Sequence, residues 1–216
     1  MNNYLLVINA GSSSIKFAIY QKHASSVALV ADAAGQIEGI GSQPSFTVKS
    51  PDGALLVERS FSVDEAGNHT DAIHIIRSWL WEYFADGTLL AVGHRVVHGG
   101  QHYAAPVLIN PAVLAELETL VPLAPLHQPH NLATIRVLLD TMPSLPQVAC
   151  FDTAFHRIQP DVAQRIAIPR RFADEGIRGY GFHGLSYEYI ASVLPALEPT
   201  LAEARIIVAH LGSGAS

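Results

Sequence analysis

The alternation of apolar and polar residues predicts that the chain opens with a β-hairpin. Apolar residues fill positions 4–8 and 17–20, and the polar segment NAGSSSIK (9–16) lies between them. Two more β-rich stretches, at 36–47 and 54–63, are separated by Pro51-Asp52-Gly53, whose residue types are typical of a turn. Several strands are therefore expected at the start of the chain.

From residue 70 the apolar residues recur with the period of a helix. Ile73, Ile76 and Leu80 share one helical face within 70–85, with Thr70 or Asp71 as the expected N-cap. The pattern also predicts a helix at 111–121 with Asn110 as its cap, helices at 132–141 and about 186–194, and strands at 89–92, 147–151 and 205–209. Residues 93–100 are expected to be irregular and residues 122–131 to form a loop. Strands followed by alternating helices and strands favour an α/β domain with a mixed sheet that ends near residue 150.

Composition and charge narrow the classes of partner. With 216 residues, 49% of them hydrophobic, the chain can form one large domain or two smaller ones. A formal net charge of −6 without a run of Lys or Arg argues against a nucleic-acid partner. Cys150 is the only cysteine, and the apolar run near the N-terminus is too short for a signal peptide or a membrane span. We expect a soluble cytoplasmic protein that acts on small molecules.

The segment 9–16 has two interpretations. It is not a P-loop, because Lys16 stands where the second glycine of that motif belongs and strand-like residues follow instead of a helix. A turn rich in backbone and hydroxyl donors, with a lysine beside it, suits a bound phosphate. An ordinary polar turn has the same composition, so this segment alone leaves both interpretations open.

Other segments offer candidate chemistry, each with a simpler alternative. Arg95 suits a bidentate grip on a carboxylate or phosphate, although a surface ion pair is the simpler explanation of an isolated arginine. Asp152 follows a predicted strand, where functional residues of α/β folds lie, but a helix cap is equally compatible. The segment GYGFHG (179–184) matches the dinucleotide pattern, yet it lacks the preceding strand, which leaves a glycine-hinged aromatic loop that presents His183.

The last residues repeat the layout of the first hairpin. An apolar run at 205–209 leads into HLGSGAS (210–216), another Gly/Ser segment. Because the sequence ends inside this segment, we expect the chain to be the N-terminal portion of a longer protein.

Six segments together are far more specific than any one of them, and they resemble the acetate kinase family. They are NAGSSSIK (9–16), GHRVVHGG (93–100), PLAPLH (122–127), FDTAFH (151–156), GYGFHG (179–184) and HLG (210–212). The resemblance implies the ribonuclease-H-like fold shared by actin, Hsp70 and sugar kinases. It also implies an N-terminal domain for acyl substrate and phosphate at 1–150, and the incomplete start of a second, nucleotide-binding domain at 151–216.

The resemblance further implies a phosphotransferase with a carboxyl acceptor. The expected reaction is the reversible, Mg²⁺-dependent transfer of the γ-phosphoryl group of ATP to acetate, giving acetyl phosphate and ADP, in a homodimer. By motif position, the residues expected to take part are Asp152, His183 and Arg95 in catalysis; Arg95, Val97, Leu126 and Phe182 at the acyl substrate; Ser12, Ser14, Lys16, His210, Leu211, Gly212, Ser213 and Gly214 at the nucleotide and its phosphates; and Asn9 at the metal. Ser213 departs from the pattern, because many members have asparagine there.

Two alternatives stay open at this point. The pocket residues do not separate acetate from propionate or butyrate, because one methylene changes binding by only about 1–3 kcal/mol. A non-catalytic nucleotide-binding module of the actin/Hsp70 type would bind ATP without a carboxylate pocket, and Arg95 with Val97 and Phe182 argues against it.

The 216-residue chain alone is expected to have no appreciable kinase activity, because the family's remaining charge-neutralising residues follow residue 216. A hydroxamate assay of the purified chain with ATP, Mg²⁺ and acetate measures this directly. Acetyl phosphate formation at the rate of a complete kinase would contradict the expectation.

Overall fold

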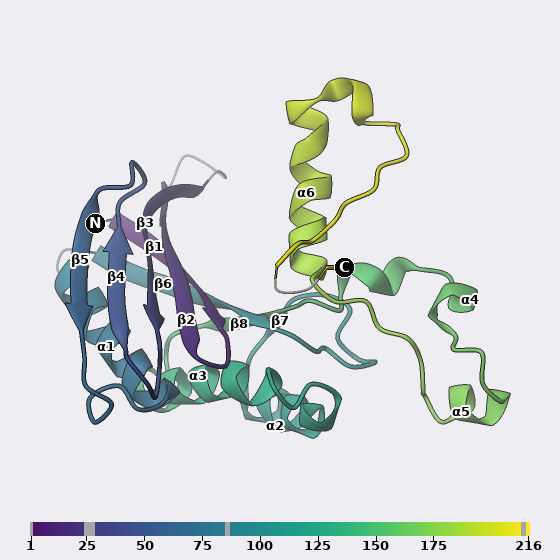
Figure 1. Cartoon of the computed structure of the whole chain (residues 1–216), viewed down its shortest axis with the longest axis horizontal. Helices are drawn as coiled ribbons and strands as arrows, with labels where there is room; N and C mark the ends of the chain where they lie inside the picture. The colour runs from purple at the N-terminus through teal and green to yellow at the C-terminus, as the bar shows by residue number, and fades with distance from the viewer. Residues whose placement is uncertain (1, 24–28, 85–86, 213–214) are drawn as a thin grey trace. The chain divides into compact units, whose positions relative to one another are not determined.

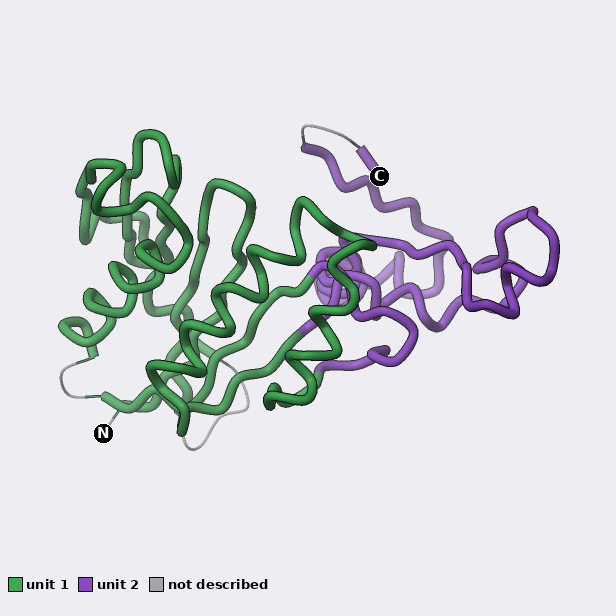
Figure 2. Tube along the Cα trace, turned by 90° about the horizontal axis from the view of Figure 1, so that it is seen from below, with its two compact units in different colours: residues 1–96, 107–149 green, residues 97–106, 150–216 purple. Residues whose placement is uncertain are grey.

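The computed structural model describes residues 2–23, 29–84, 87–212 and 215–216. The chain forms two compact units, one of residues 1–96 and 107–149 and the other of residues 97–106 and 150–216 (Figure 2). The predicted domain boundary at residue 150 assigns residues 97–106 to the first domain. In the structure these residues belong to the second unit.

A mixed eight-stranded sheet is the framework of the first unit (Figure 1). Its strands lie in the order β5-β4-β3-β2-β1-β6-β8-β7. Their bounds are β1 Asn2–Ala10, β2 Ser14–Lys22, β3 Leu29–Glu38, β4 Ser45–Lys49, β5 Leu55–Ser60, β6 Gly87–Val96, β7 Val107–Leu108 and β8 Gln147–Phe151. The strands β1 to β5 are joined antiparallel in succession, whereas β6 runs parallel to β1, so the predicted mixed sheet is confirmed.

Helices α1 (His69–Tyr83) and α3 (Gln128–Thr141) pack on one face of this sheet. Alternate residues of β1 and β2 enter the core there, where Leu6 and Phe17 belong to the same buried cluster as Ile76 of α1 and Leu138 of α3. Burial of apolar surface between a sheet face and two amphipathic helices stabilises this arrangement.

The helix starts differ in detail from their predictions. Asn68 caps α1 through a hydrogen bond from the Asp71 backbone, so neither Thr70 nor Asp71 is the cap. Asn110 caps α2 (Pro111–Thr119) as expected. Helix α3 begins at Gln128 instead of 132, because a proline at Pro129 is compatible with a first helical turn.

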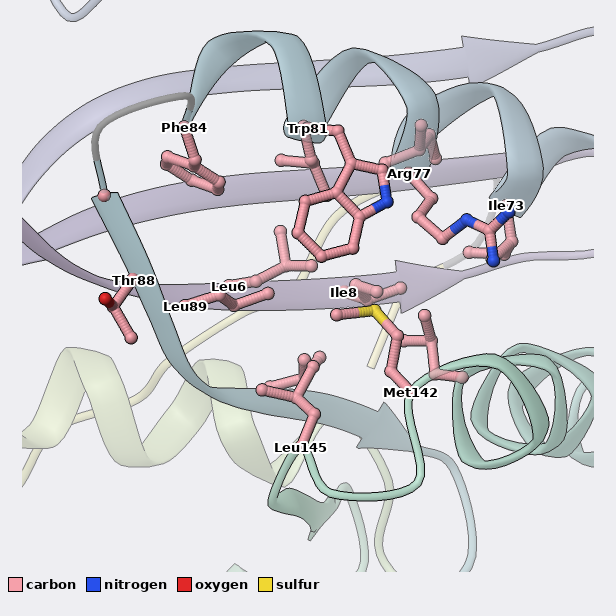
Figure 3. Close-up of a pocket in the computed structure, with 15 residues that line it drawn as sticks. Leu6, Ile8, Ile73, Arg77, Trp81, Phe84, Thr88, Leu89, Met142 and Leu145 are labelled. Atoms are coloured by element: carbon pink, nitrogen blue, oxygen red, sulfur yellow. The ribbon is translucent and has the colours of Figure 1, made fainter.

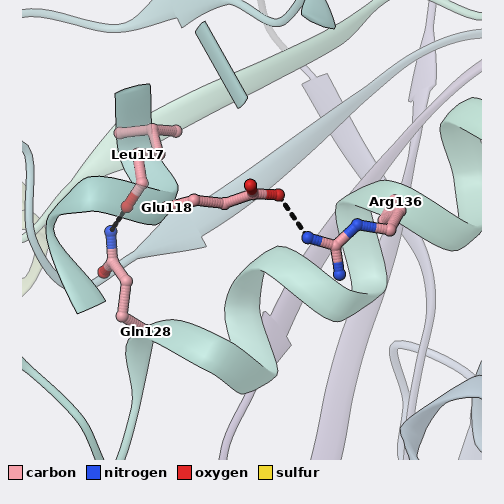
Figure 4. A network of polar contacts seen from close by, with 4 residues as sticks. All are labelled: Leu117, Glu118, Gln128 and Arg136. Atoms are coloured by element: carbon pink, nitrogen blue, oxygen red, sulfur yellow. Dashed lines mark hydrogen bonds and ion pairs between the residues drawn. The ribbon is translucent and has the colours of Figure 1, made fainter. Parts of the chain in front are cut away.

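Polar contacts join the end of α2 to the first residue and the middle of α3 (Figure 4). The side-chain amide of Gln128 is buried and donates to the Leu117 carbonyl oxygen at 3.4 Å, and Arg136 forms an ion pair with Glu118. The intervening segment contains the short 3₁₀ helix η1 (Val121–Leu123). The loop expected at 122–131 is thus shorter than predicted, because η1 and α3 occupy part of it. The hydrogen bond of Gln128 to Leu117 links the two helices that flank it.

The strand β6 also corrects the prediction that residues 93–100 are irregular. It continues through Val96 because it pairs with β1, with Val7 opposite Gly93 and Ile8 opposite His94. The strand period buries His94 on the core face and turns Arg95 to the opposite face. His94 is satisfied there, with its Nε2 2.8 Å from Oε1 of Gln147.

The second unit is mainly helical. It contains the short helices η2 (Phe155–Ile158), α4 (Asp161–Gln164), α5 (Arg170–Asp174) and η3 (Pro199–Leu201), and the longer helix α6 (Gly184–Leu197). The predicted strand at 205–209 is wrong for the described residues, because a strand forms by hydrogen bonding to a neighbour and this segment has no ladder partner among them. Ile207 is accordingly 97% exposed. In the described part of the chain no helix is both long enough and apolar enough to cross a bilayer.

The buried histidine makes the stability of the first unit depend on pH. Burial lowers the pKa of His94 to about 4, while its hydrogen bond to Gln147 acts in the opposite direction. In the unfolded chain this histidine has a pKa of about 6.5 and binds a proton below that pH. In the folded chain it stays neutral until about pH 4. The free energy of unfolding should therefore fall by about 2 kcal/mol from this residue between pH 7 and pH 5.

The variant His94→Gln keeps an amide that can pair with Gln147 and removes the titration. Urea unfolding of both proteins at pH 5, 6 and 7 should show a flatter pH dependence for the variant. Parallel curves would mean that His94 titrates alike in the folded and unfolded chains.

Candidate active site

Three polar side chains form a row on the sheet face opposite the core helices. Lys16 of β2 lies directly across from Asn9 of β1, and Ile8 pairs with His94, which makes Arg95 of β6 the next neighbour of Asn9. The Arg95 guanidinium donates from Nη1 to Oδ1 of Asn9 at 3.0 Å. Two cations separated by one amide thus lie across three adjacent strands, which favours binding of an anion.

The turn beside this row is tighter than the sequence suggested. Residues 11–13 connect the two strands, so Asn9 and Lys16 belong to β1 and β2 instead of the loop. Gly11 N–H donates to the Ser14 carbonyl at 2.7 Å, and the Ile40 N–H donates to the Ser13 carbonyl at 3.1 Å. Ser12 is exposed and Ser14 is half-buried at the start of β2.

Two side chains from the core helices also hold carbonyl oxygens of this turn. The ring of His69 lies with Nε2 2.6 Å from the Gly11 oxygen, and Asn131 donates from Nδ2 to the Ala10 oxygen at 2.6 Å. The carbonyl oxygens of Ala10, Gly11 and Ser13 thus each accept a hydrogen bond within the protein, which reduces their repulsion of a bound anion. This arrangement suits an anion better than it suits a cation.

A second histidine stacks on His69. The rings of His69 and His130 are 4.5 Å apart with an interplanar angle of 26°. The pKa of His130 is lowered, first by burial and then by the neighbouring His69 and His127. The neutral form of His130 is therefore favoured beside the turn.

In the second unit, Asp152 lies in the turn that follows β8 and is almost fully buried. Its carbonyl oxygen accepts a hydrogen bond from the Gly184 N–H at 2.8 Å. A Cβ atom at Gly184 would lie only 2.2 Å from that oxygen, so this approach requires glycine. The alternative of a helix cap is wrong, because η2 begins after Ala154 without a side-chain cap.

The aromatic loop 179–184 packs around His98. The His98 ring is 4.4 Å from the ring of Tyr180 and 5.7 Å from that of Phe182, and burial lowers the pKa of His98. His156 donates from Nε2 to the Phe182 carbonyl at 3.0 Å. Its ring also lies so close to Gly181 that a Cβ there would approach to 2.3 Å. The glycines of the motif thus permit close packing.

His183 and His210 are brought together in the second unit. Their rings stack at 4.1 Å with an interplanar angle of 7°, and Nδ1 of His183 lies 2.9 Å from the Ser216 hydroxyl. His183 precedes α6 in the left-handed region, with φ 57°. A non-glycine residue held in that conformation is uncommon and is found at functional sites.

The remaining predicted residues are distributed between the two units. In the first, Leu126 is 73% exposed; in the second, Val97 is buried and Phe182 is 37% exposed. Leu211 and Gly212 are exposed, whereas Ser213 and Gly214 lie outside the described residues. A common acyl pocket and a second phosphate loop stay predictions.

The described residues offer little to a metal ion by themselves. They contain no group of three or more His, Cys, Asp or Glu side chains that could hold one. Asn9 can supply one amide oxygen, which also accepts the hydrogen bond from Arg95. Mg²⁺ prefers carboxylates and the oxygens of substrate phosphates, so these residues do not form a complete magnesium site.

A hollow of about 250 Å³ in the first unit is unrelated to this chemistry (Figure 3). It lies between α1, β6 and the end of α3, and it is lined mainly by apolar side chains such as Leu6, Trp81 and Met142. Of the 15 residues that line it, none is a predicted site residue.

Two contributors to the site, His69 and Asn131, were missed from the sequence. Asn131 lies on the buried face of α3 beside Leu132 and Ile135. An amide at a core position of an amphipathic helix requires a buried partner, and that signal could have identified it. His69 had no comparable signal, because it is the first residue of α1.

Comparison with known proteins gives consistent results. Residues 4–216 match the Acetokinase family. A protein named acetate kinase from Nitrobacter hamburgensis is 50% identical over 212 residues, which is 98% of this chain and 52% of that protein. Another acetate kinase, from Rhodopseudomonas palustris, is 48% identical over 217 residues, covering 100% of this chain and 54% of its relative.

Solved structures agree with the sequence relatives. A propionate kinase from Francisella tularensis superposes with a TM-score of 0.84 at 35% identity, covering 99% of this chain and 53% of that one. An acetate kinase from Porphyromonas gingivalis gives a TM-score of 0.80 at 33% identity, with 99% and 53% coverage. The α/β fold of these kinases is thus confirmed, and the chain spans about half the length of the relatives that it matches.

Proposed function

The chain belongs to the acetokinase family, and from this membership we propose that the complete protein is an acetate kinase. It would transfer the γ-phosphoryl group of ATP reversibly to acetate, giving acetyl phosphate and ADP. The observation that carries the proposal is 50% identity to an acetate kinase over 98% of this chain. Because the chain spans only 52% of that relative, the activity is proposed for the complete protein.

The row on the sheet face supports this reaction. Lys16, together with Ser12 and Ser14, would bind the phosphates of the nucleotide beside the turn. Arg95 would hold the acetate carboxylate and neutralise charge on the phosphoryl group as it transfers. Phosphoryl transfer depends mainly on positioning and charge neutralisation, and these side chains provide both.

Acetate needs no general base, because its carboxylate is ionised at neutral pH. We therefore assign Asp152 to orienting Arg95 or a neighbouring group, in preference to the proton donor or acceptor role that the family implies. His183 would stabilise the transferring phosphoryl group, and Val97, Leu126 and Phe182 would enclose the methyl group of acetate. His210, Leu211, Gly212, Ser213 and Gly214 would contribute to a second nucleotide loop.

Mg²⁺ and the assembly state are part of the same proposal. Bound with ATP, the ion would neutralise phosphate charge, and Asn9 would be its contact in this chain. The remaining ligands would come from the nucleotide, from water and from residues beyond this chain. We further propose a homodimer that acts in the cytoplasm.

Propionate or butyrate as substrate is the main alternative, and the similarity to a propionate kinase structure favours propionate of these two. Rates of hydroxamate formation by the complete protein with acetate, propionate and butyrate separate the three substrates. A non-catalytic ATP-binding module would give no acyl hydroxamate with any of them, and that result would contradict the proposed function.

Arg95→Ala tests the role of the guanidinium. A charge-assisted hydrogen bond contributes about 1.5–3 kcal/mol, so kcat/KM for acetate should fall by about 10- to 150-fold. Arg136→Ala is the matched control, because it removes a guanidinium whose pairing with Glu118 is exposed. An unchanged kcat/KM for acetate in Arg95→Ala would exclude Arg95 as the acyl-binding residue.

Asp152→Asn tests the role of the buried carboxylate. The substitution is nearly isosteric, so packing around this residue should persist, while the loss of charge misorients its partner. We expect turnover by the complete protein to fall by about 100-fold. Near-normal turnover, with thermal unfolding unchanged, would contradict both the positioning role and a proton-transfer role.

A further inference from the structure

The turn at residues 11–13 is held from the core side of the sheet. Besides the hydrogen bond from the Ile40 N–H to the Ser13 oxygen, two side chains contact carbonyl oxygens at this turn. His69 contacts the Gly11 oxygen and Asn131 contacts the Ala10 oxygen, both at 2.6 Å. They join residues 58 and 121 positions apart in the sequence. These contacts therefore do not belong to the hairpin itself.

The orientation of these peptide groups decides what the turn offers to a ligand. Gly11 has the least restricted backbone of any residue type, so the hairpin alone does not fix the neighbouring peptides. A carbonyl oxygen turned toward a phosphate repels it, whereas an N–H group attracts it. A donor that holds each carbonyl on the core side thus favours the arrangement that binds an anion.

We propose that His69 and Asn131 are positioning residues that hold the turn 11–13 in the conformation that accepts the nucleotide phosphates. The inference rests on the proposed kinase function and extends it to two residues that do not touch the substrate. His69 acts through Gly11, and Asn131 acts through Ala10.

The surroundings of both side chains fit this role. A carbonyl oxygen can only accept, so Nε2 of His69 carries the hydrogen, and the stacked ring of His130 supports that ring at 4.5 Å. The backbone of His69 is fixed at the start of α1 by the Asn68 cap. Asn131 is 2% exposed on α3, so its amide is enclosed by the protein. Both donors therefore come from packed helices instead of mobile loops.

The experiment uses the complete protein with separate variants at each residue. His69→Ala and Asn131→Ala remove the donors, and His69→Gln keeps an amide N–H at a similar reach. His74→Ala on α1 and Arg136→Ala on α3 are controls on the same helices, away from the turn. Thermal unfolding of each variant establishes how much folded protein enters the assay.

We expect the alanine variants to change KM for ATP without changing KM for acetate. Loss of one neutral hydrogen bond should raise KM for ATP by about 3- to 10-fold in each alanine variant and leave KM for acetate unchanged. His69→Gln should recover most of the affinity for ATP. A merely structural role would lower kcat through loss of folded enzyme and would leave both KM values as they are.

The outcomes separate this inference from the proposed function. An active parent protein whose alanine variants keep the normal KM for ATP would overturn the inference and leave the function intact. A parent protein without acyl kinase activity would contradict the function itself. In that case binding of ADP, measured by calorimetry, replaces KM as the test: unchanged affinity in both alanine variants overturns the positioning role, and weaker binding with rescue by His69→Gln supports it.

Discussion

Parallel pairing of β1 with β6 is the constraint on which the candidate site depends. The pairing places Ile8 beside His94, so Arg95 becomes the neighbour of Asn9 on the face that the core helices leave open. A shift of one residue would exchange these faces, burying the guanidinium and exposing the core residues. The register is therefore fixed by the burial of apolar side chains, and it positions the polar row as a consequence.

The same pairing explains why a buried histidine lies next to the site. His94 occupies a core position of β6, where an unpaired ring would be costly, and Gln147 of β8 satisfies it. The strand thus carries a structural histidine and a candidate substrate-binding arginine at consecutive positions. Their roles differ because successive side chains of a strand point to opposite faces.

The core helices act on the turn as well as on the sheet. Through His69 and Asn131 they contact the carbonyl groups at the end of β1, while their apolar residues pack on the sheet below. Packing and site geometry are consequently coupled in the first unit. In the second unit, glycines permit the close contacts. Gly181 and Gly184 have no Cβ atom, so His156 and Asp152 can lie close to the aromatic loop.

Local sequence was enough to predict the hairpin, helix α1 and the Asn110 cap of α2, and six spaced motifs were enough to predict the family. Local periodicity and local capping carry that information, because neighbours in sequence are neighbours in a helix or hairpin. Three features became visible only in the folded chain: the extension of β6, the absence of a strand at 205–209 among the described residues, and the donors that hold the turn. Each of these depends on a partner far along the chain, and no local pattern specifies such a partner.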